Sequence, residues 1–126
     1  MTRPSNAPRY RCHEILEEVA RDELAYKGSL RVASAAAALA LGARCEASLA
    51  QLRCPFFCLT AAHEQVLGPR SRAAAEQLMR VAATPPGQRQ LKAYDALHGI
   101  LCEPEPARSQ TTAEIVAWLG SCAARL

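Results

Sequence analysis

Apolar residues recur at helical spacing in four stretches of the chain, and this pattern predicts four helices. The predicted helices cover residues 11–24, 30–41, 69–83 and about 112 to the end of the sequence. Gly42 is expected to interrupt or bend the second helix, and Pro69 is well placed to be the first residue of the third. Thr111 and Glu114 have the spacing of a capping box, which predicts the start of the last helix.

Two short stretches between these helices have the character of β-strands. Residues 54–60, CPFFCLT, form a continuous apolar run with a proline near its start, which is typical of a strand covered on both faces. Residues 89–94, RQLKAY, alternate and predict a second strand. Because a helix separates the two strands, we expect them to be parallel. Two parallel strands leave open edges, so the pattern implies more sheet than these residues obviously supply.

The composition is that of a globular protein of single-domain size. The 126 residues are 50% hydrophobic and 21% charged, which argues against wholesale disorder. The net charge is only +3, acidic residues lie between the basic ones, and aromatic residues make up 5% of the chain. A nucleic-acid-binding surface needs more basic and stacking side chains than this, so we expect no nucleic-acid partner.

The cysteines and the N-terminal residues bear on the compartment. All six cysteines lie within apolar segments, which favours buried, reduced thiols over a disulfide framework. The first residues, MTRPSNAPRYRC, have no apolar core of a secretory signal, and the longest run of small apolar residues, 32–43, is well short of the roughly 20 that cross a bilayer. We therefore expect a cytoplasmic protein.

Two ionisable pairs follow the predicted strands. His63 and Glu64 come after the first strand, and Asp95 and His98 come after the second. Side chains that do chemistry in open α/β sheets gather at the carboxyl ends of the strands. If the strands are neighbours, Glu64 and His98 are expected to meet. Asp95 is expected to be a turn residue, because its short side chain can bond its own backbone.

Three segments resemble α/β-hydrolases of the serine aminopeptidase S33 group, in particular the carboxyl-terminal part of monoacylglycerol lipase-like and lysophospholipase-like proteins. Residues 54–69, CPFFCLTAAHEQVLGP, are similar to the strand and loop that carry the catalytic acid of the family. Residues 91–106, LKAYDALHGILCEPEP, resemble the segment that carries its catalytic histidine. Residues 20–32, ARDELAYKGSLRV, are similar to a segment of its cap region.

This resemblance implies a partial α/β-hydrolase fold, in which a βαβα unit with short parallel strands is preceded by cap-like helices. Residues 1–9 would be a flexible lead-in, 10–53 a helical cap-like segment, and 54–126 the carboxyl-terminal part of the hydrolase domain. Glu64 would be the catalytic acid and His98 the general base, with no cofactor. If the alignment is displaced by one residue, His63 or Gln65 would stand in the place of the acid.

The nucleophile of such an enzyme is missing from the sequence. No Gly-x-Ser-x-Gly elbow occurs in the 126 residues, and the upstream His-Gly segment that helps to form the oxyanion hole is absent as well. Ser29, Ser34 and Ser71 have no elbow around them. We therefore expect a chain that is inactive alone, would act on an acyl ester or lipid only when completed by an amino-terminal half, and self-associates through exposed sheet edges.

Two other functions are compatible with parts of the sequence. The first is a small helical interaction module without catalysis, in which the first and last helices bind a partner. The second is a zinc protein with Cys54, Cys58 and His63 as ligands. On one strand face, residues 54 and 58 would be about 13 Å apart, too far to share an ion, so we expect no metal.

Overall fold

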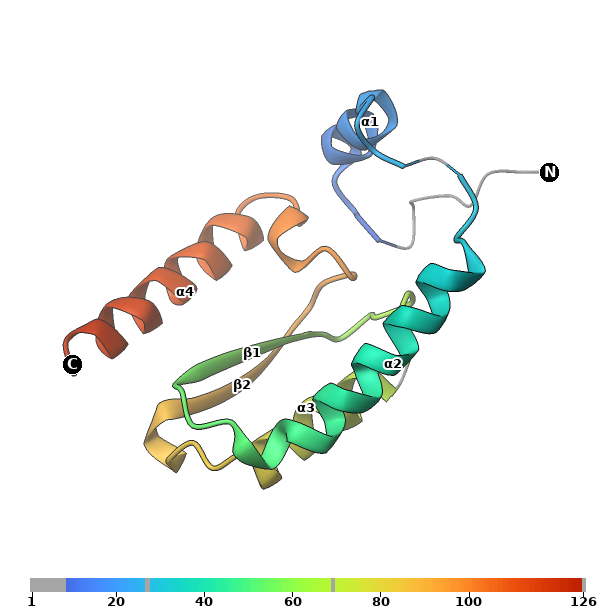
Figure 1. The fold of residues 1–126 in the computed structure, drawn as a ribbon. Coiled ribbons are helices and arrows are strands. Elements are labelled where there is room, and N and C mark those ends of the chain that lie inside the picture. Colours follow the sequence, from blue (N-terminus) through green and yellow to red (C-terminus); the bar gives the residue numbers. More distant parts are fainter. Residues whose placement is uncertain (1–8, 27, 69, 126) are drawn as a thin grey trace.

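The computed structural model describes residues 9–26, 28–68 and 70–125 of the chain. Its helices and strands follow the order helix, helix, strand, helix, strand, helix (Figure 1). Their bounds are α1 His13–Arg21, α2 Val32–Ser48, β1 Phe56–Ala61, α3 Arg70–Val81, β2 Arg89–Tyr94 and α4 Ala107–Ala123. Short 3-10 turns lie at η1 Leu49–Gln51, η2 Pro86–Gln88 and η3 Ile100–Cys102. Pro69, the predicted first residue of α3, lies outside the described residues.

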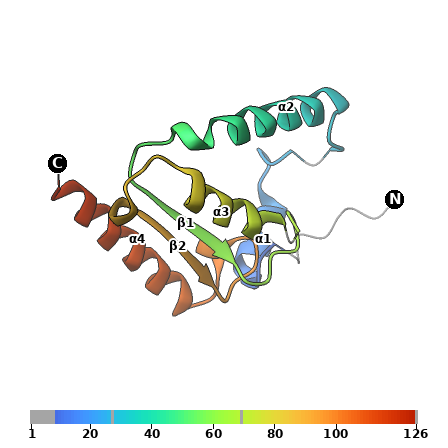
Figure 2. The ribbon, with the colours of Figure 1, turned by 90° about the horizontal axis from the view of Figure 1, so that it is seen from below.

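The two strands form a parallel sheet, as the sequence predicted. Phe56 is opposite Arg89 at one end, and Ala61 is opposite Tyr94 at the other. Helix α3 contacts both strands on one face, and α4 covers the other face, where Trp118 packs on Phe57 (Figure 2). This arrangement confirms the predicted partial α/β fold. The parallel direction of the two strands could be predicted from the sequence, because strands joined by a helical crossover run parallel.

Helices lie on both faces of β1, as predicted, but they cover it incompletely. All six of its residues are only half-buried. A strand at the edge of a two-stranded sheet has one paired side and one open side, so two helices cannot seal it. The strand also begins at Phe56, two residues later than predicted, because Pro55 before it has no backbone N–H for a sheet ladder.

The predicted start of α4 is wrong as well. The helix begins at Ala107, and the carboxylate of Glu105 accepts a hydrogen bond from the Ser109 N–H at 3.2 Å. Thr111 is a buried residue inside the helix rather than its cap. Glu114 is turned toward the sheet, where its carboxylate accepts hydrogen bonds from the Lys92 ammonium and the Tyr94 hydroxyl, both at 2.6 Å. Tertiary contacts therefore use the side chain that a capping box would have needed.

Helix α2 is longer than the sequence suggested and runs through Gly42 to Ser48. A glycine inside a helix costs about 1 kcal/mol, and the alanines and leucines around it are strong helix formers. Together with η1 it makes a 20-residue helical stretch, Val32–Gln51, which contains an 18-residue window with a mean hydropathy of 1.2 and no buried residue. By length and composition this stretch could cross a bilayer, contrary to the expectation from the shorter run. It lies outside α3 as an outer layer (Figure 2).

The cysteines are all free in the structure. Cys12 is buried, but Cys45 and Cys54 are exposed and the other three are half-buried, so the prediction of buried thiols holds for one of them. The exposed two lie on α2 and just before β1, where little of the protein packs against the chain. Apolar neighbours in sequence therefore did not ensure burial.

Candidate active site

The carboxyl ends of β1 and β2 bring two loops together. Beyond the last strand pair, the Ala62 N–H donates to the Tyr94 carbonyl at 2.8 Å, and the His63 N–H donates to the Ala96 carbonyl at 3.1 Å. These bonds continue the sheet into the loops, and Ala96 is 1% exposed. The loops therefore leave the same end of the sheet in a fixed relation to each other.

Glu64 and His98 meet at this end. The His98 Nδ1 lies 2.8 Å from the Glu64 Oε2, although the two residues are far apart in the sequence. The other carboxylate oxygen, Oε1, accepts the backbone N–H groups of Val66 and Leu67 at 2.6 and 3.0 Å. The Glu64 side chain is only 11% exposed, whereas that of His98 is 36% exposed. A largely covered carboxylate thus faces an imidazole that remains accessible.

The pKa of Glu64 lies below its ordinary range. Burial works against this by favouring the neutral acid, but the hydrogen bonds from His98 and from the Leu67 and Val66 amides outweigh it, and the charge of His98 adds to them. Glu64 is therefore an ionised acceptor near neutral pH. An ionised carboxylate can only accept, so the His98 Nδ1 carries the proton and the other ring nitrogen, Nε2, is left as the basic one.

A second pair crosses between the same two loops. The His63 Nε2 lies 2.8 Å from the Asp95 Oδ1, and the Arg11 Nη2 donates to that same oxygen at 3.1 Å. The hydrogen bond from Arg11, and to a smaller extent the one from His63, lowers the pKa of Asp95. Asp95 is thus more than the turn residue that the sequence suggested. Since His63 pairs with Asp95, the carboxylate of Glu64 is the group that reaches His98, rather than residue 63 or 65.

A groove of about 880 Å³ opens beside Glu64 and His98. It lies between the second half of α2, strand β1 and helix α3, and most of its wall is apolar. Two of its residues carry hydroxyl groups, Thr60 and Ser71, and each donates to a backbone carbonyl, of Lys92 at 3.4 Å and of Gly68 at 3.0 Å. The acid and the base therefore stand at the side of a hollow that can take an apolar group.

Residues 3–105 match the sequence profile of a hydrolase family described as serine aminopeptidase, S33. The chain belongs to this family. Its members are α/β-hydrolases, which agrees with the parallel strands, the crossover helix and the loops at the strand ends. No curated protein matches the chain.

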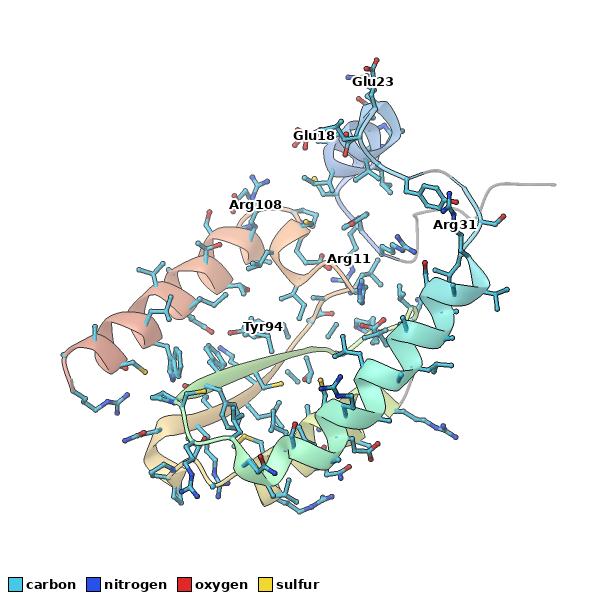
Figure 3. All side chains as sticks on the ribbon, viewed as in Figure 1. Arg11, Glu18, Glu23, Arg31, Tyr94 and Arg108 are labelled. Carbon is cyan, nitrogen blue, oxygen red and sulfur yellow. The ribbon has the colours of Figure 1, made fainter. Side chains whose placement is uncertain are left out.

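Two residues near this acid–base pair were not predicted from the sequence. Arg11, just before α1 (Figure 3), reaches the loop after β2. Glu103 is buried and bonds to Leu97 of the same loop. Arg11 gave no signal, because the residues with which it pairs are more than eighty positions away. Glu103 did carry one, since it is the first charged residue after the apolar stretch 99–102. Burial of that acid cannot be read from its neighbours alone.

A zinc site finds no support in the described part of the chain. There, no three His, Cys, Asp or Glu side chains are grouped so that they could hold a metal ion. Cys54 lies before β1, Cys58 lies within it, and the His63 imidazole is occupied with Asp95.

Acidification is expected to destabilise the protein partly through Glu64. Because its pKa is lowered in the folded state, its contribution is present above the ordinary glutamate pKa of about 4.3 and is lost as the pH falls through the folded value. Urea unfolding at about pH 7 and about pH 3 should show a smaller loss of stability for Glu64→Gln than for the wild type. His98→Ala should also reduce the loss, because it removes one donor to the carboxylate. Equal losses in all three proteins would contradict the assignment.

Proposed function

We propose that this chain supplies the acid and the base of a serine hydrolase, while the nucleophilic serine comes from a segment outside these 126 residues. The observation that carries the proposal is the 2.8 Å contact between His98 and Glu64 at the ends of neighbouring parallel strands. A carboxylate, an imidazole and a hydroxyl in series are what acyl transfer requires. Two of these three groups, the Glu64 carboxylate and the His98 imidazole, are present here and hydrogen-bonded to each other.

In the proposed reaction, the His98 Nε2 removes the proton from the serine hydroxyl as its oxygen attacks the substrate carbonyl. Glu64 holds the Nδ1 proton and stabilises the imidazolium that forms. The imidazolium then returns the proton to the departing alcohol, and water repeats the sequence to release the acid. The Val66 and Leu67 amides keep Glu64 ionised and in place during these steps.

Neither of the two hydroxyl groups that line the groove is placed as a substitute nucleophile. Both hydroxyl groups of the groove, on Thr60 and Ser71, are bonded to backbone carbonyls, and no elbow is present in the sequence to hold a serine in a strained turn. Backbone donors for the oxyanion belong to the same missing elements. Inactivity of the isolated chain follows from this proposal.

We propose an acyl ester with an apolar chain, of the monoacylglycerol or lysophospholipid type, as the substrate of the completed enzyme. The support is the largely apolar groove beside His98, bounded by the apolar helix α2. The missing half would extend the sheet along one of its outer edges, because neither strand has a second partner among the described residues. Without it, exposed edges favour self-association of the chain.

The helical interaction module is not favoured. It predicted a protein without strands, whereas the described residues contain a parallel pair and the chain belongs to a hydrolase family.

Reaction with a fluorophosphonate probe tests the proposal on the chain alone. We expect no labelling and no hydrolysis of a short-chain p-nitrophenyl ester, because no activated serine is present. Clear labelling that Ser71→Ala abolishes would show that the groove contains its own nucleophile and would overturn the proposal. A catalytically competent serine hydrolase, treated in parallel, confirms that the probe is reactive.

A further inference from the structure

The segment before α1 lies against the loop that carries His98. We call residues 9–12 the N-terminal strap. The Gly99 N–H donates to the Arg9 carbonyl at 2.8 Å. A Cβ atom added at Gly99 would stand 2.5 Å from the ring of Tyr10, so the strap and the loop are in direct contact there. The residue held in this way is the immediate neighbour of His98.

Beneath the same loop lies Glu103, whose side chain is 3% exposed. Its Oε1 accepts the Leu97 N–H at 2.6 Å, and its Oε2 lies 3.5 Å from the Arg11 Nη1. The guanidinium of Arg11 also donates to the Asp95 carbonyl at 3.0 Å and to the Asp95 carboxylate at 3.1 Å. These bonds hold the backbone before His98, and the bond from the Gly99 N–H to the Arg9 carbonyl holds it after His98.

We propose that Arg11 and Glu103 are positioning residues, which hold the His98 loop so that the imidazole stays within hydrogen-bond distance of Glu64. This inference rests on the proposed function, because it concerns the same acid–base pair. Neither residue touches the imidazole. They act through Leu97, Asp95 and, by way of the strap, Gly99.

The physical reason lies in the burial of Glu103. A carboxylate that is removed from water is stable only when its oxygens are bonded, and here one oxygen holds the loop backbone while the other faces the strap cation. Exposed ion pairs such as that of Arg11 with Asp95 contribute little alone, since water screens them. The buried carboxylate of Glu103 therefore holds the Arg11 guanidinium in place against the loop.

The titration of Glu64, followed by the carbon-13 resonance of its carboxyl group, measures whether His98 is in place. In Glu103→Gln the amide has one acceptor oxygen and an NH₂ group, so it cannot serve both Leu97 and Arg11. We expect the titration midpoint of Glu64 to move up toward the midpoint found in His98→Ala. Amide exchange at Leu97 and Gly99 should rise about tenfold or more. Glu105→Gln is the matched control and should keep the wild-type values, because Glu105 bonds only within the start of α4.

Arg11→Gln provides a second test that leaves the buried carboxylate intact, with Arg108→Gln as its control. If circular dichroism shows that Glu103→Gln does not fold, the Arg11→Gln variant takes its place in the test. The inference is overturned if Glu103→Gln, or Arg11→Gln in its place, keeps the wild-type midpoint of Glu64 while His98→Ala raises it. That result would leave the acid–base pair, and with it the proposed function, intact. If His98→Ala itself does not raise the midpoint, the pair is absent and both proposals fail.

Discussion

Replacing His98 with alanine is expected to lower ester hydrolysis about 10⁶-fold once the chain is combined with a polypeptide that carries the Gly-x-Ser-x-Gly half of the enzyme. The loss is large because no other group at the site can take the proton of the serine. Glu64→Gln should cost about 10⁴-fold, since the imidazole would remain but in the wrong tautomer and without a charge to stabilise it. Turnover of a p-nitrophenyl ester by the mixed polypeptides measures both effects.

The matched control is His13→Ala. His13 also pairs with a glutamate, Glu17 at 3.1 Å, but on the exposed surface of α1, so activity should not change. An equal loss in His13→Ala and His98→Ala would show that the imidazole of His98 has no special role. Faster turnover of an aminoacyl p-nitroanilide than of the ester would contradict the ester assignment. An in-frame nucleophile elbow upstream in the gene would place both halves in one polypeptide.

Trp118→Ala is expected to lower the free energy of unfolding by about 2 to 3 kcal/mol. The Trp118 ring lies 5.8 Å from that of Phe57, with the planes tilted by 47°, and this pair joins α4 to the sheet. Both rings are half-buried, so the loss should fall at or below the low end of the range for a fully enclosed aromatic residue. Urea titration followed by far-ultraviolet circular dichroism gives the value, because the change also removes the single tryptophan.

Val116→Ala is the control on the same helix. Val116 is 61% exposed, and its truncation should cost less than about 0.5 kcal/mol. If the two variants lose equal stability, α4 is not held to the sheet by the Trp118 contact. The polar link from Glu114 to Lys92 and Tyr94 would then be the stronger one.

The parts of the fold that were predictable depend on local pattern and chain order. Strand β2 has the predicted bounds, because alternation over a few residues is a local property. The meeting of Glu64 and His98 could be expected because the carboxyl ends of parallel strands share one end of a sheet. The family resemblance added the roles of acid and base.

The parts that could not be predicted depend on contacts between distant residues. Glu114 has a good spacing for a cap, yet its carboxylate bonds to Lys92 and Tyr94 instead. The continuation of α2 through Gly42 follows from the sum of propensities over many residues rather than from one glycine. Arg11 reaches Asp95 and Glu103 only because the strap folds back on the loop. Pairings of this kind leave no trace in sequence spacing.

The most direct test of the acid–base pair is the proton magnetic resonance of the His98 Nδ1–H. A ring N–H that donates to a carboxylate at 2.8 Å is protected from exchange and strongly deshielded. We expect a low-field resonance that disappears in His98→Ala, is displaced in Glu64→Gln, and persists in His63→Ala. Its persistence in His98→Ala, or an unchanged position in Glu64→Gln, would contradict the account.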